Sequence, residues 1–301
     1  ARGTGPAGAG LARAVLIALL AAGPLHALTL PLMELVHGDL REIDWMISFP
    51  AFNNVRRAGH LYTLSAAVGL GLVLWPGEGA RARIAIGLLA ACATGLVLWS
   101  GARGAWVALL LGCALAALHP RGPTRHVGAL AACLALAVAI AVSLPEPTAS
   151  VGLMTEIEHS IRRAGDADDF LSGRVGLWRT TLDLIGEAPL TGHGWGQFLL
   201  HQEAYPFPQV HSFPLELMFA FGVPMGLLAM GVLLALWLRA QRTGGAQGCC
   251  ALMPLNTMAA YSLIDGPYFY GVPVIATGMV WGLCLAFAPA PSPEISPGRP
   301  R

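Results

Sequence analysis

The feature that most constrains this fold is a series of apolar runs, each close to the length that crosses a lipid bilayer. A spanning helix needs about 17–25 mostly apolar residues. Eight runs qualify, near residues 11–36, 58–75, 83–100, 103–119, 126–144, 213–238, 248–265 and 269–288. Only 12% of the residues are charged, against roughly 25% in soluble domains. We therefore predict an all-α, polytopic membrane protein with about eight transmembrane helices.

Arginine placement predicts which side of the membrane each connection occupies. All 18 basic residues are Arg, which excludes a Walker-type phosphate loop and Schiff-base chemistry, because both need Lys. Short cytoplasmic loops carry an excess of basic residues. Most of the short Arg-rich connections share one side, where the only acids are Glu78 and Glu294. That side is predicted to be cytoplasmic. The connections on the other side are then the 37–57 loop, the Ser100–Arg103 turn, residues 145–212 and the Asp265–Tyr268 turn.

One long polar stretch divides the chain into regions. We expect about five spans in residues 1–144, one large outer loop with short helices in 145–212, about three spans in 213–288, and a disordered cytoplasmic tail in 289–301. The six cysteines all lie in apolar runs, which argues against a disulfide framework. Because the first residue is Ala1 rather than Met, we expect part of the N-terminus to be missing.

Within the large loop, Ser172 is predicted to cap a helix that runs to about Ile185. Val175, Trp178, Leu182 and Ile185 would form its apolar stripe, suited to the membrane surface or the helix bundle. Arg174 falls in the first turn, where free backbone amides and the positive helix end favour an anion. A solvated surface arginine is the alternative.

Three further arginines of the predicted outer side are candidate ligands for an anion. Arg103, in the turn Trp99–Trp106, would suit a lipid-linked phosphate, because guanidinium binds phosphate bidentately. It could equally reach the interface without a ligand. Arg56 and Arg57 oppose the charge trend of the outer loops, which indicates an anionic ligand. Ion pairs with Asp39, Glu42 or Asp44 would explain them equally well.

His211 precedes the helix predicted from residue 213. A helix N-terminus disfavours imidazolium, so this ring is a candidate general base, with a simple interfacial histidine as the alternative. The Pro189–Gly196 run has no strand before it and is not a dinucleotide motif; its glycines, Gly192 and Gly194 among them, would allow a tight backbone path that shapes a site. The spacing of His193, His201 and His211 matches no metal motif, so no metal is expected.

Together the Ser100–Trp106, Arg174–Trp178, Pro189–Phe198 and His211–Gly222 segments resemble the O-antigen ligase and polymerase superfamily of bacterial envelope glycosyltransferases. The resemblance implies a multi-pass protein of the inner (cytoplasmic) membrane with one large periplasmic loop and a periplasm-facing site. The implied reaction moves a glycan from undecaprenyl pyrophosphate to a glycan, lipid A core or protein hydroxyl. No metal, cofactor or nucleic acid is implied.

The resemblance also implies residue roles: Arg103 and Arg174 hold the pyrophosphate, and His211 acts on the acceptor hydroxyl with inversion. We assign substrate binding to Arg56, Arg57, Trp178, Gly192, His193 and Gly194. The sequence departs from the family at His211-Ser212, where His-Asn is common, and at Ala220, where Glu is common two residues before a Gly. It also shows about eight spans where ten or more are usual, so N-terminal spans are expected to be absent.

Two other classes of protein stay open. A transporter of polysaccharide or lipid carrier would place ionisable groups at mid-membrane, and Pro254, Asn256 and Asp265 in the seventh run allow it. A non-catalytic scaffold is the third reading. The glycosyltransferase hypothesis makes a geometric prediction: Arg103, Arg174 and His211 should converge around one cavity.

Overall fold

The computed structural model describes residues 6–39, 43–75, 78–119, 127–146, 151–163, 165, 173–201, 209–243 and 245–287, and every regular element among them is helical. The all-α class is therefore confirmed; the 289–301 tail lies outside the described residues. The helices are α1 (Pro6–Ala27), α2 (Thr29–His37), α3 (Val55–Val73), α4 (Ala80–Trp99), α5 (Arg103–Leu118), α6 (Val127–Ser143), α7 (Leu153–Arg162), α9 (Arg174–Glu187), η2 (Gln197–His201), α10 (Phe213–Gln241), α11 (Gly245–Ile264), η3 (Pro267–Phe269) and α12 (Gly271–Phe287).

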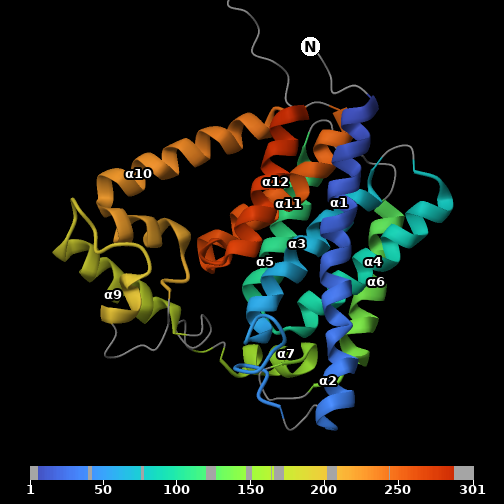
Figure 1. Cartoon of the computed structure of the whole chain (residues 1–301), viewed down its shortest axis with the longest axis horizontal. Coiled ribbons are helices and arrows are strands. Elements are labelled where there is room, and N and C mark those ends of the chain that lie inside the picture. The colour runs from blue at the N-terminus through green and yellow to red at the C-terminus, as the bar shows by residue number, and fades with distance from the viewer. Residues whose placement is uncertain are drawn as a thin grey trace, which may run out of the picture.

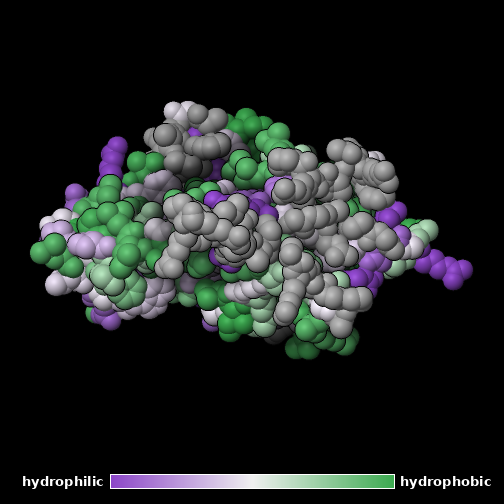
Figure 2. Space-filling model, turned by 90° about the horizontal axis from the view of Figure 1, so that it is seen from above, coloured by the Kyte–Doolittle hydropathy of each residue, from purple (hydrophilic) through white to green (hydrophobic). Residues whose placement is uncertain are grey.

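All eight predicted apolar runs are helical. Three stretches of the described chain are long and apolar enough to cross a membrane: Gly8–Val36, Ala80–Trp99 and Phe213–Gln241. Shorter apolar helices occupy four of the other runs. Large hydrophobic side chains on α5 and α10, such as Leu110 and Leu228, are exposed, and apolar surface is visible around the grey atoms in Figure 2. Lipid contact explains this exposure, while the number of spans stays a prediction.

Helix α3 is the centre of the bundle. Nearly all of its side chains are buried, and it packs against α1, α4, α5, α11 and α12 (Figure 1). Two of its polar side chains hydrogen-bond to backbone carbonyls of the helices: Thr63 donates to the Gly59 carbonyl, and Ser65 donates to the Leu19 carbonyl. Small residues let the backbones approach. A side chain at Gly71 would lie 2.4 Å from the Cys250 carbonyl oxygen on α11.

The first half of helix α10 lies away from this bundle and packs against α9, whereas its C-terminal end returns to α11, where Trp237 and Gln241 donate to Asn256 (Figure 1). The helical path of α10 breaks at Gly222, where φ is 77°, and Pro224 follows. The break leaves backbone groups without partners inside the helix. The Pro189–Gly194 loop supplies them: His193 N donates to Phe219 O at 2.8 Å, Gly194 N to Ala220 O at 3.0 Å, and Val223 N to Pro189 O at 2.7 Å. The glycine-rich run therefore clamps the break in α10.

The loop helix differs from its predicted form. It begins at Arg174 after Gly173, which adopts a left-handed conformation with φ 75°, while Ser172 lies outside the described residues. Its buried face is Leu177, Thr181 and Ile185, whereas Leu182 is 54% exposed. Of the predicted stripe only Ile185 is buried, because the cluster around Phe198 and Phe219 selects the adjacent face. Contact of the stripe with the membrane surface stays a prediction.

Candidate active site

Three helix ends meet at the end of the bundle where α3 begins and α11 finishes. Glycines permit the approach: a side chain at Gly59 on α3 would lie 3.2 Å from Ser100 Oγ, and one at Gly104 on α5 would lie 3.3 Å from the Tyr261 ring on α11. This packing places the first turn of α3, the start of α5 and the residue after α11 side by side. Each of these ends carries an ionisable side chain.

Asp265, directly after α11, is the centre of the first group. Its Oδ1 accepts a hydrogen bond from His211 Nδ1 at 2.8 Å and one from the Gly266 amide at 2.8 Å. Its Oδ2 accepts from Arg174 Nη2 at 3.1 Å. His60 Nε2, on α3, lies 3.9 Å from Oδ1. One carboxylate therefore joins the loop helix, the segment before α10 and the bundle.

The charge state of Asp265 follows from these neighbours. Burial by itself would raise its pKa, but the hydrogen bond from His211, the nearby His60 ring and the Arg174 charge outweigh burial and hold the pKa well below its usual range. Asp265 is therefore a carboxylate at ordinary pH. It can orient the His211 ring with Nδ1–H toward itself and stabilise a proton taken up at Nε2.

Glu156, buried on α7, is the centre of the second group. Its Oε1 lies 2.8 Å from Arg103 Nε, and its Oε2 lies 4.0 Å from Arg56 Nη2. Arg103 is also close enough to Arg56 and Arg174 for their charges to act on it. The cluster around Asp265 and the cluster around Glu156 therefore interact electrostatically. The guanidinium groups of these clusters are partly exposed: the Arg103 and Arg174 side chains are 18% and 21% accessible.

The backbone just before His211 is held in place by side chains of α9 and α10. Trp178 Nε1 donates to Val210 O at 3.1 Å, and the Val210 amide donates to Glu216 Oε2 at 3.1 Å. His211 itself has φ 54°, a conformation that non-glycine residues adopt rarely and mostly where surrounding structure enforces it. The chain therefore fixes the backbone as well as the ring of His211.

We compared the sequence with models of known protein families. The family model described as O-antigen ligase matches residues 88–230. The chain belongs to the O-antigen ligase superfamily. No curated protein matched the chain. The superfamily match covers Arg103, Arg174 and His211, while Arg56, His60 and Asp265 lie outside it. Membership makes the chain a membrane glycosyltransferase-like protein of ligase or polymerase type.

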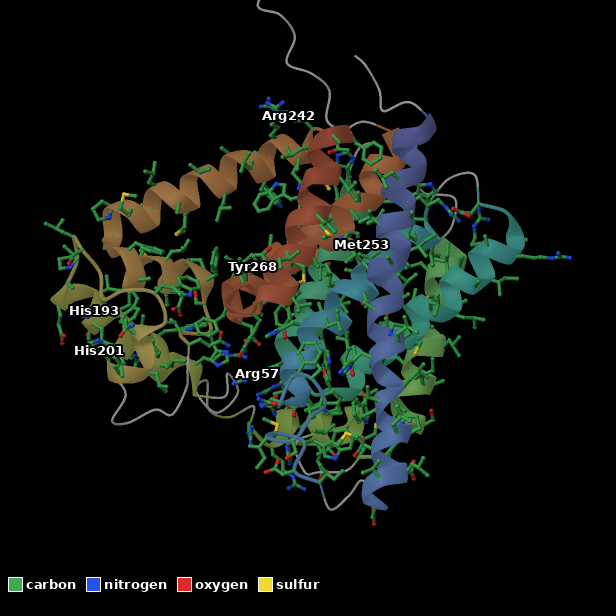
Figure 3. All side chains as sticks on the ribbon, in the orientation of Figure 1. Arg57, His193, His201, Arg242, Met253 and Tyr268 are labelled. Atoms are coloured by element: carbon green, nitrogen blue, oxygen red, sulfur yellow. The ribbon has the colours of Figure 1, made fainter. Side chains whose placement is uncertain are left out.

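The remaining predicted site residues fall into two places. Arg57 lies over the Tyr270 ring, 5.3 Å from its centroid, beside the Asp265 group. Gly192, His193 and Gly194 instead contact α9 and α10: the His193 ring donates to Leu184 O at 2.7 Å and stacks on Phe219. Figure 3 shows His193 and His201 well away from Arg57. A role of this loop in substrate binding stays a prediction.

Sequence reasoning missed His60, Glu156 and Asp265 as candidate site residues of this O-antigen ligase-type chain. Asp265 is the acid in the short turn between two apolar runs, a signal used for the transporter alternative only. Glu156 lies on the buried face of an amphipathic helix with Leu153, but nothing in the sequence connects it to Arg103. Among the described residues, no three His, Cys, Asp or Glu side chains are grouped to hold a metal ion.

An apolar groove of about 660 Å³ opens next to the site. It lies between α10 on one side and α5 and α11 on the other, with Phe213 and Tyr268 at the end nearest His211. Its lining is almost entirely hydrocarbon, with Leu111, Leu234 and Leu263 among the side chains. The groove offers a binding site for a long apolar chain within reach of charged groups.

Proposed function

We propose that the chain transfers a glycan from a polyprenyl diphosphate, undecaprenyl pyrophosphate in bacteria, to an acceptor hydroxyl. The reaction would take place at the periplasmic face of the inner membrane. The observation that carries the proposal is the bridge from His211 through Asp265 to Arg174. It couples a candidate base to a cation that suits a phosphate leaving group.

The charge balance supports a diphosphate ligand. Guanidinium groups outnumber the carboxylates here: Arg56, Arg57, Arg103 and Arg174 lie around Glu156 and Asp265, and Arg163 is also close enough to act on Arg103. A surplus of positive charge remains. Each arginine has five N–H donors, so Arg103 and Arg174 can contact phosphate without releasing Glu156 or Asp265. A diphosphate diester carries two negative charges, and its leaving oxygen gains charge in the transition state.

The reaction is a single displacement. The acceptor oxygen forms a bond to the anomeric carbon while the bond from that carbon to the phosphate oxygen breaks, and the diphosphate leaves with the electron pair. The acceptor proton passes to His211 Nε2, and Asp265 stabilises the resulting imidazolium. Attack opposite to the leaving group inverts the anomeric carbon. These steps use side chains of the protein and no metal.

The apolar groove supports a polyprenyl carrier. A hydrocarbon chain lying between α10 and α11 would bury apolar surface and bring its diphosphate toward Arg103 and Arg174. Phe213, at the start of α10, lines this groove and also the small pocket beside His211. The lipid part and the acceptor part of the reaction would therefore lie on either side of one residue.

The test uses purified chain in proteoliposomes with undecaprenyl-diphosphate glycan and a panel of acceptors. We expect a new glycosidic product with inverted stereochemistry. His211→Ala should lower its rate by about 10²–10⁴-fold, the usual contribution of a general base. Translocation of the glycan without product would favour a transporter, and binding without turnover would favour a scaffold. Growth of the glycan on itself would identify a polymerase, and transfer to lipid A core or protein would identify a ligase.

A further inference from the structure

A second, much smaller pocket lies beside His211. Its polar lining is Gln209, His211, Ser212, Glu216 and Gly266, and aromatic side chains of Trp195, Phe213 and Phe269 complete it. The enclosed space is about 10 Å³, which is about the room that one water molecule or one hydroxyl group requires. The pocket is therefore hydroxyl-sized and lies next to the candidate base.

Two hydrogen-bond acceptors in this lining lack partners. Glu216 Oε1 and Gln209 Oε1 are both buried without a hydrogen bond, and the residues are only 4% and 3% exposed. The other Glu216 oxygen accepts from the Val210 amide. Buried polar groups are nearly always paired, so two unpaired acceptors in one small pocket indicate a site for a group that donates hydrogen bonds.

The chemistry of the two acceptors selects the ligand. A hydroxyl group donates a hydrogen bond and carries no charge, so it can satisfy Glu216. A diphosphate diester at ordinary pH offers acceptor oxygens only, and the Glu216 carboxylate repels it. This pocket therefore accepts hydrogen bonds, whereas the arginines that contact Asp265 and Glu156 donate them. The exposed indole of Trp195, which stacks with Phe269, offers an apolar face beside the pocket for the C–H face of a sugar ring.

We propose that this pocket binds a hydroxyl group of the acceptor sugar, next to the hydroxyl that attacks. The attacking hydroxyl has one proton, which it must donate to His211. The neighbouring hydroxyl donates to Glu216 Oε1 and so fixes the sugar. Glu216 and Gln209 are then acceptor-binding residues, and the pocket favours sugars with two adjacent hydroxyl groups. The inference deepens the proposed function and rests on it for the role of His211.

The structure gives a conservative variant. In Glu216→Gln the amide oxygen can still accept from the Val210 amide, so the segment that holds His211 is kept. The amide nitrogen then faces the pocket as a donor. The variant therefore removes the hydrogen-bond acceptor that would hold the sugar hydroxyl, while the side-chain volume and its packing hardly change. Gln209→Met removes the second acceptor at similar size, and Glu187→Gln, at the exposed end of α9, is the matched control.

Binding is measured without donor or turnover. The probes are the methyl α-glycosides of glucose, galactose and mannose, observed by saturation-transfer NMR on the full chain in nanodiscs. We expect at least one glycoside to bind the wild type, Glu216→Gln and Gln209→Met to weaken it at least tenfold, and Glu187→Gln to leave it unchanged. No binding by any of the three glycosides, or equal binding by wild type and Glu216→Gln, would overturn the proposal.

Deoxyfluoro analogues of the bound glycoside add a sharper readout. Fluorine replaces a hydroxyl at similar size but cannot donate a hydrogen bond. One ring position should then lose binding at least tenfold in the wild type and much less in Glu216→Gln. Equal losses in both proteins at every position would also sink the idea. A chain that binds glycosides in this way but forms no product keeps the pocket and loses the proposed function, so the two failures are distinct.

Discussion

His211 Nδ1 and Asp265 Oδ1 are 2.8 Å apart although 54 positions separate the residues in sequence. The carboxylate also holds Arg174 at 3.1 Å. It therefore orients the candidate base and positions a candidate phosphate ligand at once. In acid–base catalysis, a carboxylate behind a histidine holds its tautomer and stabilises its protonated form.

Asp265→Asn tests this relationship. The amide cannot stabilise an imidazolium and does not pair with Arg174 as an ion, so glycan transfer should fall by up to about 10⁴-fold, the drop seen when such a carboxylate is replaced by an amide. Rates are measured with purified protein in proteoliposomes. Asp183→Asn, at an exposed position of α9, is the control and should transfer at the wild-type rate. A fully active Asp265→Asn protein would remove Asp265 from the mechanism.

The low pKa of Asp265 predicts a pattern of stability with pH. A carboxylate whose folded pKa is depressed contributes stability above its unfolded pKa, about 3.9, and loses it as pH falls through the folded value. The melting temperature of wild type should therefore exceed that of Asp265→Asn at pH 5. This margin should shrink as the pH falls below about 4. A margin that grows as the pH falls below 4 would contradict the assigned direction.

Glu156 predicts an effect on donor use. Its carboxylate holds Arg103 at 2.8 Å and faces Arg56 at 4.0 Å. Glu156→Gln keeps the shape but loses the charge that aligns both guanidinium groups. We expect KM for the polyprenyl-diphosphate donor to rise by about 10–100-fold, the effect of losing about 1.4–2.8 kcal/mol of positioning, while KM for the acceptor stays unchanged. Glu158→Gln, on the exposed face of the same helix, is the control. A loss confined to kcat would instead place Glu156 in the chemical step.

The helices and the candidate arginines were predictable, whereas the contacts that join these arginines to other residues were not. Apolar runs predict helices because every backbone N–H and C=O group in lipid must find a hydrogen-bond partner within the same segment. The observed bounds of α3 to α6 are close to the predicted ones. Arg103, Arg174 and His211 could be selected because their charge or position is unusual. The carboxylates that join them could not, because Glu156 and Asp265 reach them only through tertiary packing. The local argument for His211 considered the helix end alone and left out the facing Asp265 carboxylate.

For the glycine-rich loop, the sequence predicted the local backbone shape but not the helix that the loop contacts. Its pattern predicted a tight backbone path, and the structure has one, but the path clamps α10. The clamp depends on two backbones that cross: a side chain at Gly222 would lie 2.4 Å from Leu190 O, and one at Gly192 would lie 2.5 Å from Gly222 N. Nothing in either segment alone indicates the other.

Gly222→Ala and Gly196→Ala compare the glycine at the crossing with one that meets no neighbour. Both glycines have a positive φ, 77° and 73°, but a side chain at Gly196 would meet no atom within 4 Å. Gly196→Ala should cost about 1–2 kcal/mol from positive-φ backbone strain alone. Gly222→Ala adds the clash with Leu190 O and a φ/ψ pair of 77° and 164° that is essentially confined to glycine, so it should cost about 1–3 kcal/mol more. Thermal unfolding in detergent measures both variants. Because the clamp fixes the first half of α10 behind His211, Gly222→Ala should also lower glycan transfer, while Gly196→Ala should keep most of it. Equal destabilisation of the two variants would show that the crossing of the loop and α10 contributes nothing to stability.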